Sequence, residues 1–366
     1  MNILHLVPAM ESGGVETGTV DLALSLKQLG HTVTVISNGG RLVRALEDNG
    51  IEHICLPVHI KSPHSLFLVP KIANILRLKK IDIVHASSRV PAWIGYLTCK
   101  LAGVKFVTSC HGFYSTHFFS RVMGWGELVM VISKTVEKRM IEDFGVPKEK
   151  IRLIYRGLDL EKYPYYPNKY DKEKETPIII NIGRITPIKG QLEFIKAMER
   201  VVNEKNRAEA WIVGGAEGAR EFYLNDLKSL VKKSGLEKHV KFLGLRPDIQ
   251  DLLKKADCLV LSSNVPEGFG RVIIEAGAVG TASCASDIGG VKEIIDDGTS
   301  GLLFPPGDDF KMAGAILKML SDRELCKRCS RALRRKVEES FTLDKMAKDT
   351  LSVYEEVLKG PTIISH

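Results

Sequence analysis

Long apolar runs are missing from this sequence of 366 residues. None approaches the roughly 18 to 20 consecutive apolar residues that a membrane-spanning helix requires. The first strand-like run, residues 3–7, begins almost at Met1 and leaves no room for a signal peptide before it. We therefore expect neither a transmembrane helix nor a secretory leader, and a cytoplasmic location.

Cysteine is also scarce. The seven cysteines are an odd number scattered mostly through apolar segments, which favours a reducing compartment and buried free thiols. The one Cys-x-x-Cys pair, Cys326 and Cys329, lies in a basic helical stretch without a second ligand pair nearby. Helix packing is therefore favoured there over a zinc or redox site. With 44% hydrophobic and 26% charged residues, the composition is that of a globular protein.

The net charge of +8 is concentrated in the N-terminal half, where residues 1–170 contain 21 Lys and Arg against 14 Asp and Glu. Such a basic surface favours an anionic membrane, an anionic ligand or nucleic acid, although a basic solvated surface explains the charge equally well. No basic motif is interleaved with aromatic residues, so nucleic acid is not expected as a partner.

Short apolar runs rich in β-formers alternate with amphipathic helical patterns, which predicts parallel sheets covered by helices. The predicted strands of the first half are residues 2–7, 32–37, 53–56, 83–86, 105–110 and 128–132, and those of the second half are 178–182, 210–213, 240–243, 258–261, 282–285 and 302–304. Predicted helices include residues 16–29, 41–48, 66–79, 92–102, 191–203 and 223–234.

Near residue 160 the alternation is interrupted by a segment rich in Pro and Tyr, 163–167, and then by a charged run, 169–174. This composition is typical of a linker between domains. We therefore predict an α/β protein with two Rossmann-like, doubly wound lobes, at residues 1–165 and 166–342. Residues 343–366 are predicted to form a C-terminal amphipathic helix packed on the outside, followed by a frayed tail from 360 onward.

Two glycines, Gly13 and Gly14, lie between the first predicted strand and the first predicted helix. A loop of this kind presents free backbone N–H groups and the positive end of a helix at the carboxyl edge of a sheet, which suits a phosphate or sugar oxygen. Glycines in such a loop can equally serve only the turn, and the pair alone leaves both interpretations open.

The loop that opens the second lobe carries two cations, because Arg184 follows Gly183 and lies five residues before Lys189. A guanidinium can bind two diphosphate oxygens at once and an ammonium adds a point charge. Together they can offset the charge of a leaving nucleoside diphosphate without a metal ion. Two solvated surface cations remain the alternative.

A pair of glutamates flanks another loop and the start of a helix. Glu267 begins the loop that continues with Gly268, Phe269 and Gly270, and Glu275 lies eight positions after Glu267, slightly more than two helical turns. Burying the Glu275 carboxylate among its apolar neighbours is costly unless it is hydrogen-bonded, and vicinal sugar hydroxyls are suitable donors. A structural glutamate at a helix cap is the alternative.

His111 follows the predicted strand 105–110, at a strand end where ligands of open sheets collect. An isolated histidine is often only a packed residue, so a packing role and a functional role both remain open.

In combination these residues resemble glycosyltransferase family 4, whose members carry a Gly-Gly loop, a His-Gly, a Gly-Arg…Lys-Gly loop and Glu-x7-Glu in this order. The resemblance covers nearly the whole chain. It includes residues 156–159, Arg-Gly-Leu-Asp, which are similar to the family's Asn-Gly-Val-Asp but replace its Asn with Arg, and residues 289–294, which are similar to its Gly-Gly-x-x-Glu-Ile. The fold implied is GT-B, with two Rossmann-like lobes facing across a cleft.

The resemblance implies that Arg184 and Lys189 bind the donor diphosphate, that Glu275 holds the ribose, and that Glu267 holds the donor sugar. It places His111 near C6 of that sugar. The residues implied in catalysis are His111, Arg184, Lys189 and Glu267, and those implied in donor binding are Gly13, Gly14, Gly183, Arg184, Lys189, Glu267, Gly268, Phe269, Gly270, Arg271 and Glu275.

The activity implied is transfer of a sugar, with retention of configuration, from a nucleotide-diphosphate sugar to a glycan or lipid-linked acceptor in lipopolysaccharide or cell-surface polysaccharide synthesis. A UDP-sugar is the favoured donor. No Asp-x-Asp follows a strand, so neither a metal ion nor another cofactor is expected. A nucleotide-sugar epimerase of the same fold and a non-catalytic nucleotide-sugar-binding subunit are the alternatives.

The acceptor region is predicted in the basic half, where residues 113–125 and 66–80 combine aromatic and cationic side chains. These segments would dock a lipid-linked acceptor, or the protein itself, at the inner face of an anionic membrane. Burial of the same aromatics in the core is the alternative.

Overall fold

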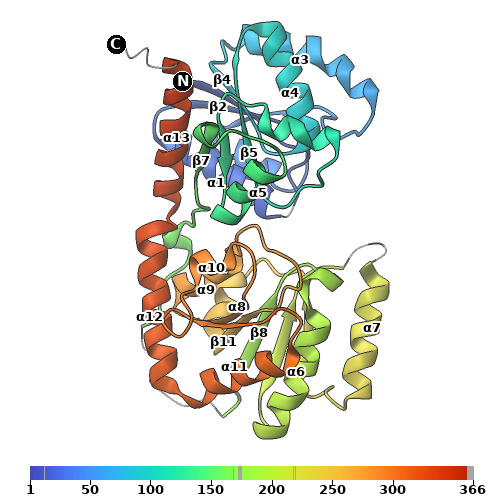
Figure 1. The fold of residues 1–366 in the computed structure, drawn as a ribbon, viewed down its shortest axis with the longest axis vertical. Helices are drawn as coiled ribbons and strands as arrows, with labels where there is room; N and C mark the ends of the chain where they lie inside the picture. The colour runs from blue at the N-terminus through green and yellow to red at the C-terminus, as the bar shows by residue number, and fades with distance from the viewer. Residues whose placement is uncertain (12, 168, 172–174, 217, 219, 361–366) are drawn as a thin grey trace. The chain divides into compact units, whose positions relative to one another are not determined.

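The computed structural model describes residues 1–360 except 12, 168, 172–174, 217 and 219. The chain divides into two compact units (Figure 1). The N-terminal lobe contains Met1–Asp159 and the segment from Thr342 onward, and the C-terminal lobe contains Leu160–Phe341. Part of the expected linker, 172–174, and the expected frayed tail, 361–366, lie outside the described residues.

The N-terminal lobe is built on a seven-stranded sheet in the order β3-β2-β1-β4-β5-β6-β7, with every pairing parallel. Its strands are β1 (Asn2–Leu6), β2 (Thr32–Ser37), β3 (Glu52–Cys55), β4 (Ile83–Ala86), β5 (Lys105–Cys110), β6 (Val129–Val131) and β7 (Ile151–Leu153). Central strands are buried on both faces, which explains why they read as nearly continuous apolar runs.

Helices cover this sheet (Figure 1). They are α1 (Gly14–Gln28), α2 (Val43–Glu47), α3 (Leu68–Leu78), α4 (Arg89–Ala102), α5 (Lys134–Glu142) and α13 (Leu343–Lys359), with shorter 3-10 turns at η1 (Pro63–Phe67), η2 (Phe118–Gly124) and η3 (Lys148–Lys150). The C-terminal helix α13 packs against α1 and buries Tyr354 completely.

The turn at residues 156–159 joins α13 to the N-terminal lobe. The Leu343 N–H donates to the Leu158 carbonyl at 2.9 Å. A Cβ on Gly157 would lie 2.5 Å from the Thr342 carbonyl oxygen, so only glycine allows this approach. The glycine of the Arg-Gly-Leu-Asp motif is therefore explained by packing in this turn.

The C-terminal lobe contains a six-stranded parallel sheet in the order β10-β9-β8-β11-β12-β13. Its strands are β8 (Ile178–Ile182), β9 (Glu209–Val213), β10 (Val240–Gly244), β11 (Cys258–Leu261), β12 (Ala282–Ser286) and β13 (Leu302–Phe304). Its helices are α6 (Gln191–Glu204), α7 (Arg220–Lys233), α8 (Ile249–Lys255), α9 (Arg271–Val279), α10 (Val291–Ile294), α11 (Asp309–Ser321) and α12 (Arg323–Ser340), with 3-10 turns at η4 (Leu160–Lys162) and η5 (Pro187–Lys189).

Both sheets have the strand order of a Rossmann fold, in which the order reverses beside the first strand of the lobe. The predicted fold class of two Rossmann-like lobes is therefore confirmed. Residues from Thr342 onward belong to the N-terminal lobe, whereas the sequence predicted a separate C-terminal segment. Strand β7 was not predicted. No helix in the described part of the chain is long and apolar enough to cross a membrane.

The cysteines are free thiols, and six of them are buried as predicted. Cys55 is the exception, because it lies on β3, the strand at the edge of the sheet. Cys326 and Cys329 are buried in α12, in line with helix packing.

Candidate functional site

Each lobe has one topological switch point, where the strand order reverses. In the N-terminal lobe it lies between β1 and β4, and in the C-terminal lobe between β8 and β11. Ligands of open parallel sheets bind beyond the carboxyl ends of the strands at such points. The loops after β1, β8 and β11 contain most of the residues predicted to form the site.

Lys189 and Glu267 lie in loops after two neighbouring strands, and the structure brings them together. The Lys189 ammonium forms an ion pair with the Glu267 carboxylate, and both side chains are mostly buried. The Ser263 hydroxyl donates to the same carboxylate oxygen. An ammonium has three donors, so Lys189 keeps donors for a second anion while it contacts Glu267.

The loops that carry this pair are fixed by hydrogen bonds. The Ser262 hydroxyl donates to the Lys189 carbonyl at 2.8 Å, and the Asn264 N–H donates to the Ile188 carbonyl at 3.0 Å. Buried Asn181 of β8 donates to the Ser262 hydroxyl at 3.0 Å. Gly190 has φ of 66°, and a Cβ there would lie 1.9 Å from the Ser262 carbonyl oxygen. The position of Lys189 is thus determined by backbone packing.

Arg184 lies in the same loop with an exposed side chain. Its backbone is held by Gln191, which is fully buried and donates to the Arg184 carbonyl at 3.0 Å. Within the described residues, the guanidinium forms no ion pair. Gly183 lies beside the stem of Lys189, since a Cβ on it would be 3.7 Å from Lys189 Cδ. One cation is thus paired and the other faces solvent.

The loop from Glu267 to Gly270 is fixed by contacts with Phe341 and with the loop at residues 289–290. The Phe269 ring is only 3% exposed and makes an edge contact with Phe341, with the ring centroids 5.3 Å apart. The Gly290 N–H donates to the Glu267 carbonyl at 2.9 Å, and a Cβ on Gly289 would lie 2.4 Å from the same oxygen. The Gly-Gly pair at 289–290 is therefore needed so that the two loops can approach.

Glu275 lies on α9 one turn after Arg271, and Arg271 Nε donates to its carboxylate at 2.9 Å. Both side chains are mostly buried. This pairing supplies a charged hydrogen-bond donor for a carboxylate among apolar neighbours. In the structure, Glu275 is therefore bound by the Arg271 side chain. It lies in the second turn of α9, after the N-cap residue Gly270.

Three helices at the switch points begin at glycines, because Gly13 caps α1, Gly190 caps α6 and Gly270 caps α9. A glycine has no side chain to bind the free N–H groups of the first turn. By contrast, side chains of Ser133 and Asp308 cap α5 and α11. The three glycine-capped ends can therefore offer their N–H groups to an anion.

His111 lies in the N-terminal lobe just after β5, half-buried. Its Nε2 lies 2.7 Å from the Ser109 hydroxyl. Burial, then the charge of Arg156, then His85 lower the pKa of His111 well below its usual value. The imidazole is consequently neutral at pH 7 and acts as a hydrogen-bonding group.

Several residues at the site were not singled out from the sequence. Ser262, Ser263, Asn181 and Gln191 orient the predicted groups, and Arg156 was noted only as a departure from the family motif. The one available signal was Asn181, a buried polar residue inside the apolar run of β8. The serines and Gln191 look like ordinary loop and helix residues.

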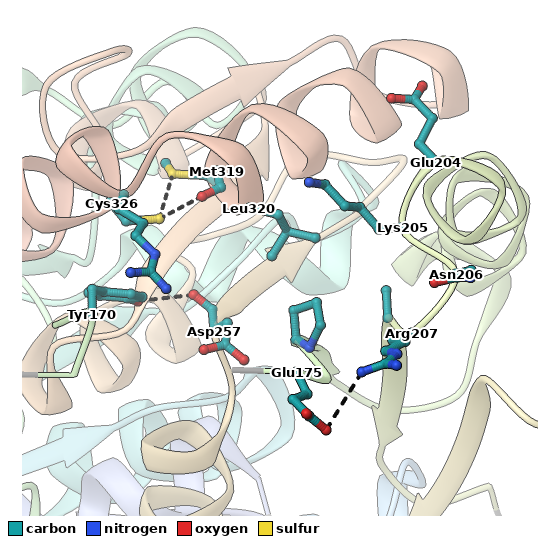
Figure 2. Close-up of a pocket in the computed structure, with 13 residues that line it drawn as sticks. Tyr170, Glu175, Glu204, Lys205, Asn206, Arg207, Asp257, Met319, Leu320 and Cys326 are labelled. Carbon is teal, nitrogen blue, oxygen red and sulfur yellow. Dashed lines mark hydrogen bonds and ion pairs between the residues drawn. The ribbon is translucent and has the colours of Figure 1, made fainter. Parts of the chain in front are cut away.

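A cavity of about 230 Å³ lies in the C-terminal lobe at the amino ends of the strands, opposite the edge that carries the predicted site (Figure 2). It is lined by Pro177, Ala208 and Asp257, which precede β8, β9 and β11. In Figure 2 Glu175 pairs with Arg207, at 3.6 Å. None of the predicted site residues lines this cavity, so size alone does not locate the site. The described residues contain no cluster of His, Cys, Asp or Glu that could hold a metal ion.

Comparison with known proteins identifies the family of the chain. Residues 12–162 match the family described as Glycosyltransferase Family 4, and residues 164–336 match the family described as Glycosyl transferases group 1. N-acetyl-alpha-D-glucosaminyl L-malate synthase of Bacillus anthracis is 26% identical, with 96% of each chain covered.

Two crystal structures are similar over nearly the whole chain. A glycosyltransferase from Rickettsia africae is 32% identical, with a TM-score of 0.89, and the match covers 98% of this chain and 99% of the other. HepE of Anabaena, solved in complex with UDP and glucose, is 24% identical, with a TM-score of 0.85 and coverage of 97% and 99%. The latter similarity concerns the fold.

Proposed function

The chain belongs to the glycosyltransferases of GT-B fold, with a family 4 domain followed by a group 1 domain, and on this premise we propose that it is a retaining, metal-independent transferase. The donor is a UDP-sugar. The acceptor is a glycan or a lipid-linked glycan of lipopolysaccharide or cell-surface polysaccharide synthesis. The observation that carries the proposal is the meeting of Lys189 and Glu267 at the switch point of the C-terminal lobe.

In this proposal the donor diphosphate binds Lys189, Arg184 and the glycine-capped N-terminus of α9. Exposed Arg184 makes a bidentate contact with the phosphate oxygens. Lys189 adds its charge while it still contacts Glu267. Glu275 accepts hydrogen bonds from the ribose, and Glu267 accepts them from the donor sugar. HepE is a fold neighbour solved with UDP, and the proposal extends that nucleotide to this chain.

The reaction breaks the bond between the anomeric carbon and the β-phosphate oxygen. The acceptor hydroxyl forms the new bond from the same face and gives its proton to the departing phosphate. The protein contributes by stabilising negative charge on the leaving group, an effect of about 3 to 4 kcal/mol for each well-placed donor. Lys189, Arg184 and the N–H groups of α9 are the donors for this charge.

The donor can be tested with a thermal-shift panel of UDP, GDP, ADP and their sugars. UDP at about 100 times its dissociation constant should stabilise the protein by roughly 2.7 kcal/mol, with GDP and ADP having smaller effects. A chelator should leave both this shift and UDP release from the donor unchanged. No shift with any of the three nucleotides would remove the proposal. Donor incubated alone should yield no isomerised sugar, which separates the transferase from an epimerase.

The acceptor is proposed to approach an aromatic patch on the N-terminal lobe formed by Trp93, Phe118, Phe119 and Trp125. Phe118 and Phe119 are 61% and 72% exposed, and Trp93 contacts both rings. The Trp93 indole N–H donates to the Phe119 carbonyl at 2.8 Å, which fixes the patch to α4. Exposed Arg121 lies in the same turn, η2.

Exposed aromatic rings beside cations favour the interface of an anionic membrane, where a lipid-linked acceptor would lie. Other aromatics of the predicted segment, such as Trp125, are partly covered, so the segment combines exposed and partly buried rings. We therefore include peripheral contact with the inner membrane face in the proposal.

Sedimentation with vesicles containing phosphatidylglycerol at low salt tests this contact. The wild type should sediment, and Phe118→Ser with Phe119→Ser should not. Phe222→Ser is the matched control, because Phe222 is 77% exposed in the C-terminal lobe. If the wild type stays in the supernatant, or the control loses as much binding, membrane contact through this patch is wrong.

A further inference from the structure

Arg89 is the first residue of α4 and lies just beyond the carboxyl end of β4. Strand β4 borders the switch point of the N-terminal lobe, so Arg89 lies at the edge where ligands of open sheets bind. Its side chain is half-buried. Removing a guanidinium partly from water is costly unless protein groups or a ligand compensate for the lost hydration. The partners of Arg89 therefore indicate whether a ligand is expected there.

The partners of Arg89 are neutral. Its Nη1 donates to the hydroxyls of Ser115 at 3.1 Å and Ser120 at 3.3 Å. The guanidinium also lies over the Tyr114 ring, 5.6 Å from the ring centroid. Within the described residues, Arg89 forms no ion pair with a carboxylate. The positive charge of Arg89 is therefore not offset by an acidic side chain.

One edge of the Arg89 guanidinium is open to a ligand. Its Nε and Nη2 atoms form no hydrogen bond within the described residues. Neither atom is among the buried polar atoms that lack a partner, so solvent reaches both. Nε and Nη2 lie side by side on the planar group, and their N–H groups can bind two oxygens of one phosphate or carboxylate.

The segment around Arg89 carries positive charge only. Residues 83–126 contain four Lys and Arg and no Asp or Glu. One of these cations, Lys105, is paired with Glu127 just beyond the segment, at 2.7 Å. Arg89 has no such countercharge, and it is half-buried, so an anion beside it is attracted more strongly than it would be on an exposed surface.

Arg89 and the aromatic patch share one face of α4. Trp93 follows Arg89 by four positions, about one helical turn, so the two side chains are neighbours on the helix. Both also bind η2, because the Trp93 indole donates to the Phe119 carbonyl and Arg89 donates to the adjacent Ser120. The cation therefore lies at one end of the exposed rings. A ligand that covers both has an anionic head and an apolar chain.

We propose that Arg89 binds the phosphate of a lipid-linked acceptor, with the start of the lipid chain against the aromatic patch. Nε and Nη2 donate to two phosphate oxygens, and the exposed Ser115 hydroxyl, which accepts from Nη1, can donate to a third. A phosphate has three such oxygens and more negative charge than a carboxylate, which suits this set of donors. The inference rests on the proposed function and specifies its acceptor as one joined to its lipid through a phosphate.

The test compares octyl phosphate with octanoate and octanol, which have the same chain length, and with inorganic phosphate. Each is titrated at pH 7 and constant ionic strength, below the concentration at which micelles form. The full chain carries Trp211→Phe, so that the fluorescence of Trp93 and Trp125 reports on the patch. Octyl phosphate should bind at least about tenfold more tightly than the other three, because only it combines a phosphate with the chain.

Arg89→Met should weaken binding of octyl phosphate at least about tenfold and leave the affinity for octanol within about twofold, which shows that the patch is still folded. Lys100→Met is the matched control, because it removes the same charge from the same face of α4. Lys100 lies about three turns further along the helix, at the opposite edge of the sheet. Its variant should bind octyl phosphate as the wild type does.

The proposal is overturned if octanol, octanoate or inorganic phosphate binds as tightly as octyl phosphate, or if Arg89→Met and Lys100→Met lose affinity equally. Sedimentation with phosphatidylglycerol vesicles separates an acceptor from bulk phospholipid. The two variants should sediment equally, since general attraction to the vesicle depends on charge alone. Loss of sedimentation only in Arg89→Met would assign the site to phospholipid headgroups and contradict the acceptor. Failure of UDP to bind would contradict the proposed function and leave these results readable.

Discussion

At the scale of single residues, the ion pair between Lys189 and Glu267 connects the loops after β8 and β11. Both side chains are mostly buried, so removal of one partner leaves the other charge poorly solvated. The same pair brings a cation to the place where the leaving diphosphate is proposed to lie. In the proposed function, binding and catalysis therefore depend on a lysine that also connects the two loops.

Lys189→Ala should reduce turnover about a hundredfold, because one preorganised charge contributes roughly 3 kcal/mol to the transition state. The measurement is UDP release from the donor in a coupled assay, with circular dichroism to confirm folding.

Lys241→Ala is the control for that variant. Lys241 also forms an ion pair with a glutamate, Glu209, at 2.7 Å, but it is 48% exposed on β10 and away from the switch point. The turnover of Lys241→Ala should stay within about twofold of the wild type, because exposed ion pairs contribute little to stability. Equal losses in the two variants would show that ion pairing, and not position, explains the effect.

At the scale of elements, the loops of the candidate site depend on close backbone contacts. Gly290 has φ of −69°, a conformation that alanine adopts readily. A Cβ there would nevertheless lie 2.6 Å from the Gly268 carbonyl oxygen and 2.9 Å from the Phe269 Cα. The obstacle is backbone, which cannot move aside as the end of a flexible side chain can.

Gly290→Ala should therefore displace the 267–270 loop, lower the stability by about 1 to 3 kcal/mol and weaken donor binding. Gly314→Ala is the matched control, because Gly314 lies in α11 and a Cβ there would meet no neighbouring atom within 4 Å. The control should gain about 0.5 to 1 kcal/mol. Urea unfolding and donor titration measure both effects, and unchanged donor affinity in Gly290→Ala would contradict the account.

Element positions could largely be predicted from the sequence, because buried parallel strands are short apolar runs between helical patterns. Strands β8, β11 and β13 begin and end at the predicted residues. Strand β7 was missed because its three residues include Arg152 and follow a charged segment, so they do not form an apolar run. Periodicity also could not show that α13 returns to the N-terminal lobe, since this depends on contacts between segments far apart in sequence.

The candidate site was predictable only in part. Motif residues such as Lys189 and Glu267 could be identified, and their pairing followed once the strand order was known. His5 and His85 lie inside apolar strands, where the sequence is typical of core. A small cavity lined by these two histidines and His111 depends on how three strands align, so no local pattern could reveal it.

At the scale of the whole molecule, buried histidines make stability depend on pH. His5 has a pKa of about 4 in the folded protein, against about 6.5 when exposed. Between these values the unfolded chain binds more protons, so the free energy of unfolding falls as the pH falls from 6.5 to 4. The lowered pKa values of His85 and His111 act in the same direction.

From the size of its shift, His5 alone should contribute about 3 kcal/mol to this loss over the whole range, and about 2 kcal/mol of it between pH 7 and pH 5. Urea unfolding at pH 7 and pH 5 should show the effect, followed by Trp93 and Trp125 fluorescence in a Trp211→Phe background so that the N-terminal lobe is observed. His5→Asn should flatten the dependence on pH. Identical slopes for this variant and the wild type would contradict the assignment.

The claim that the C-terminal lobe binds a nucleotide through Glu275 is tested most directly by calorimetric titration with UDP in the presence of a chelator. The wild type should bind one UDP per chain, and Glu275→Gln should bind at least about tenfold more weakly. Glu338→Gln should match the wild type, because Glu338 makes the same one-turn pair with an arginine, Arg334, but lies on α12. No binding of UDP by the wild type, or equal affinity in Glu275→Gln, would contradict the account.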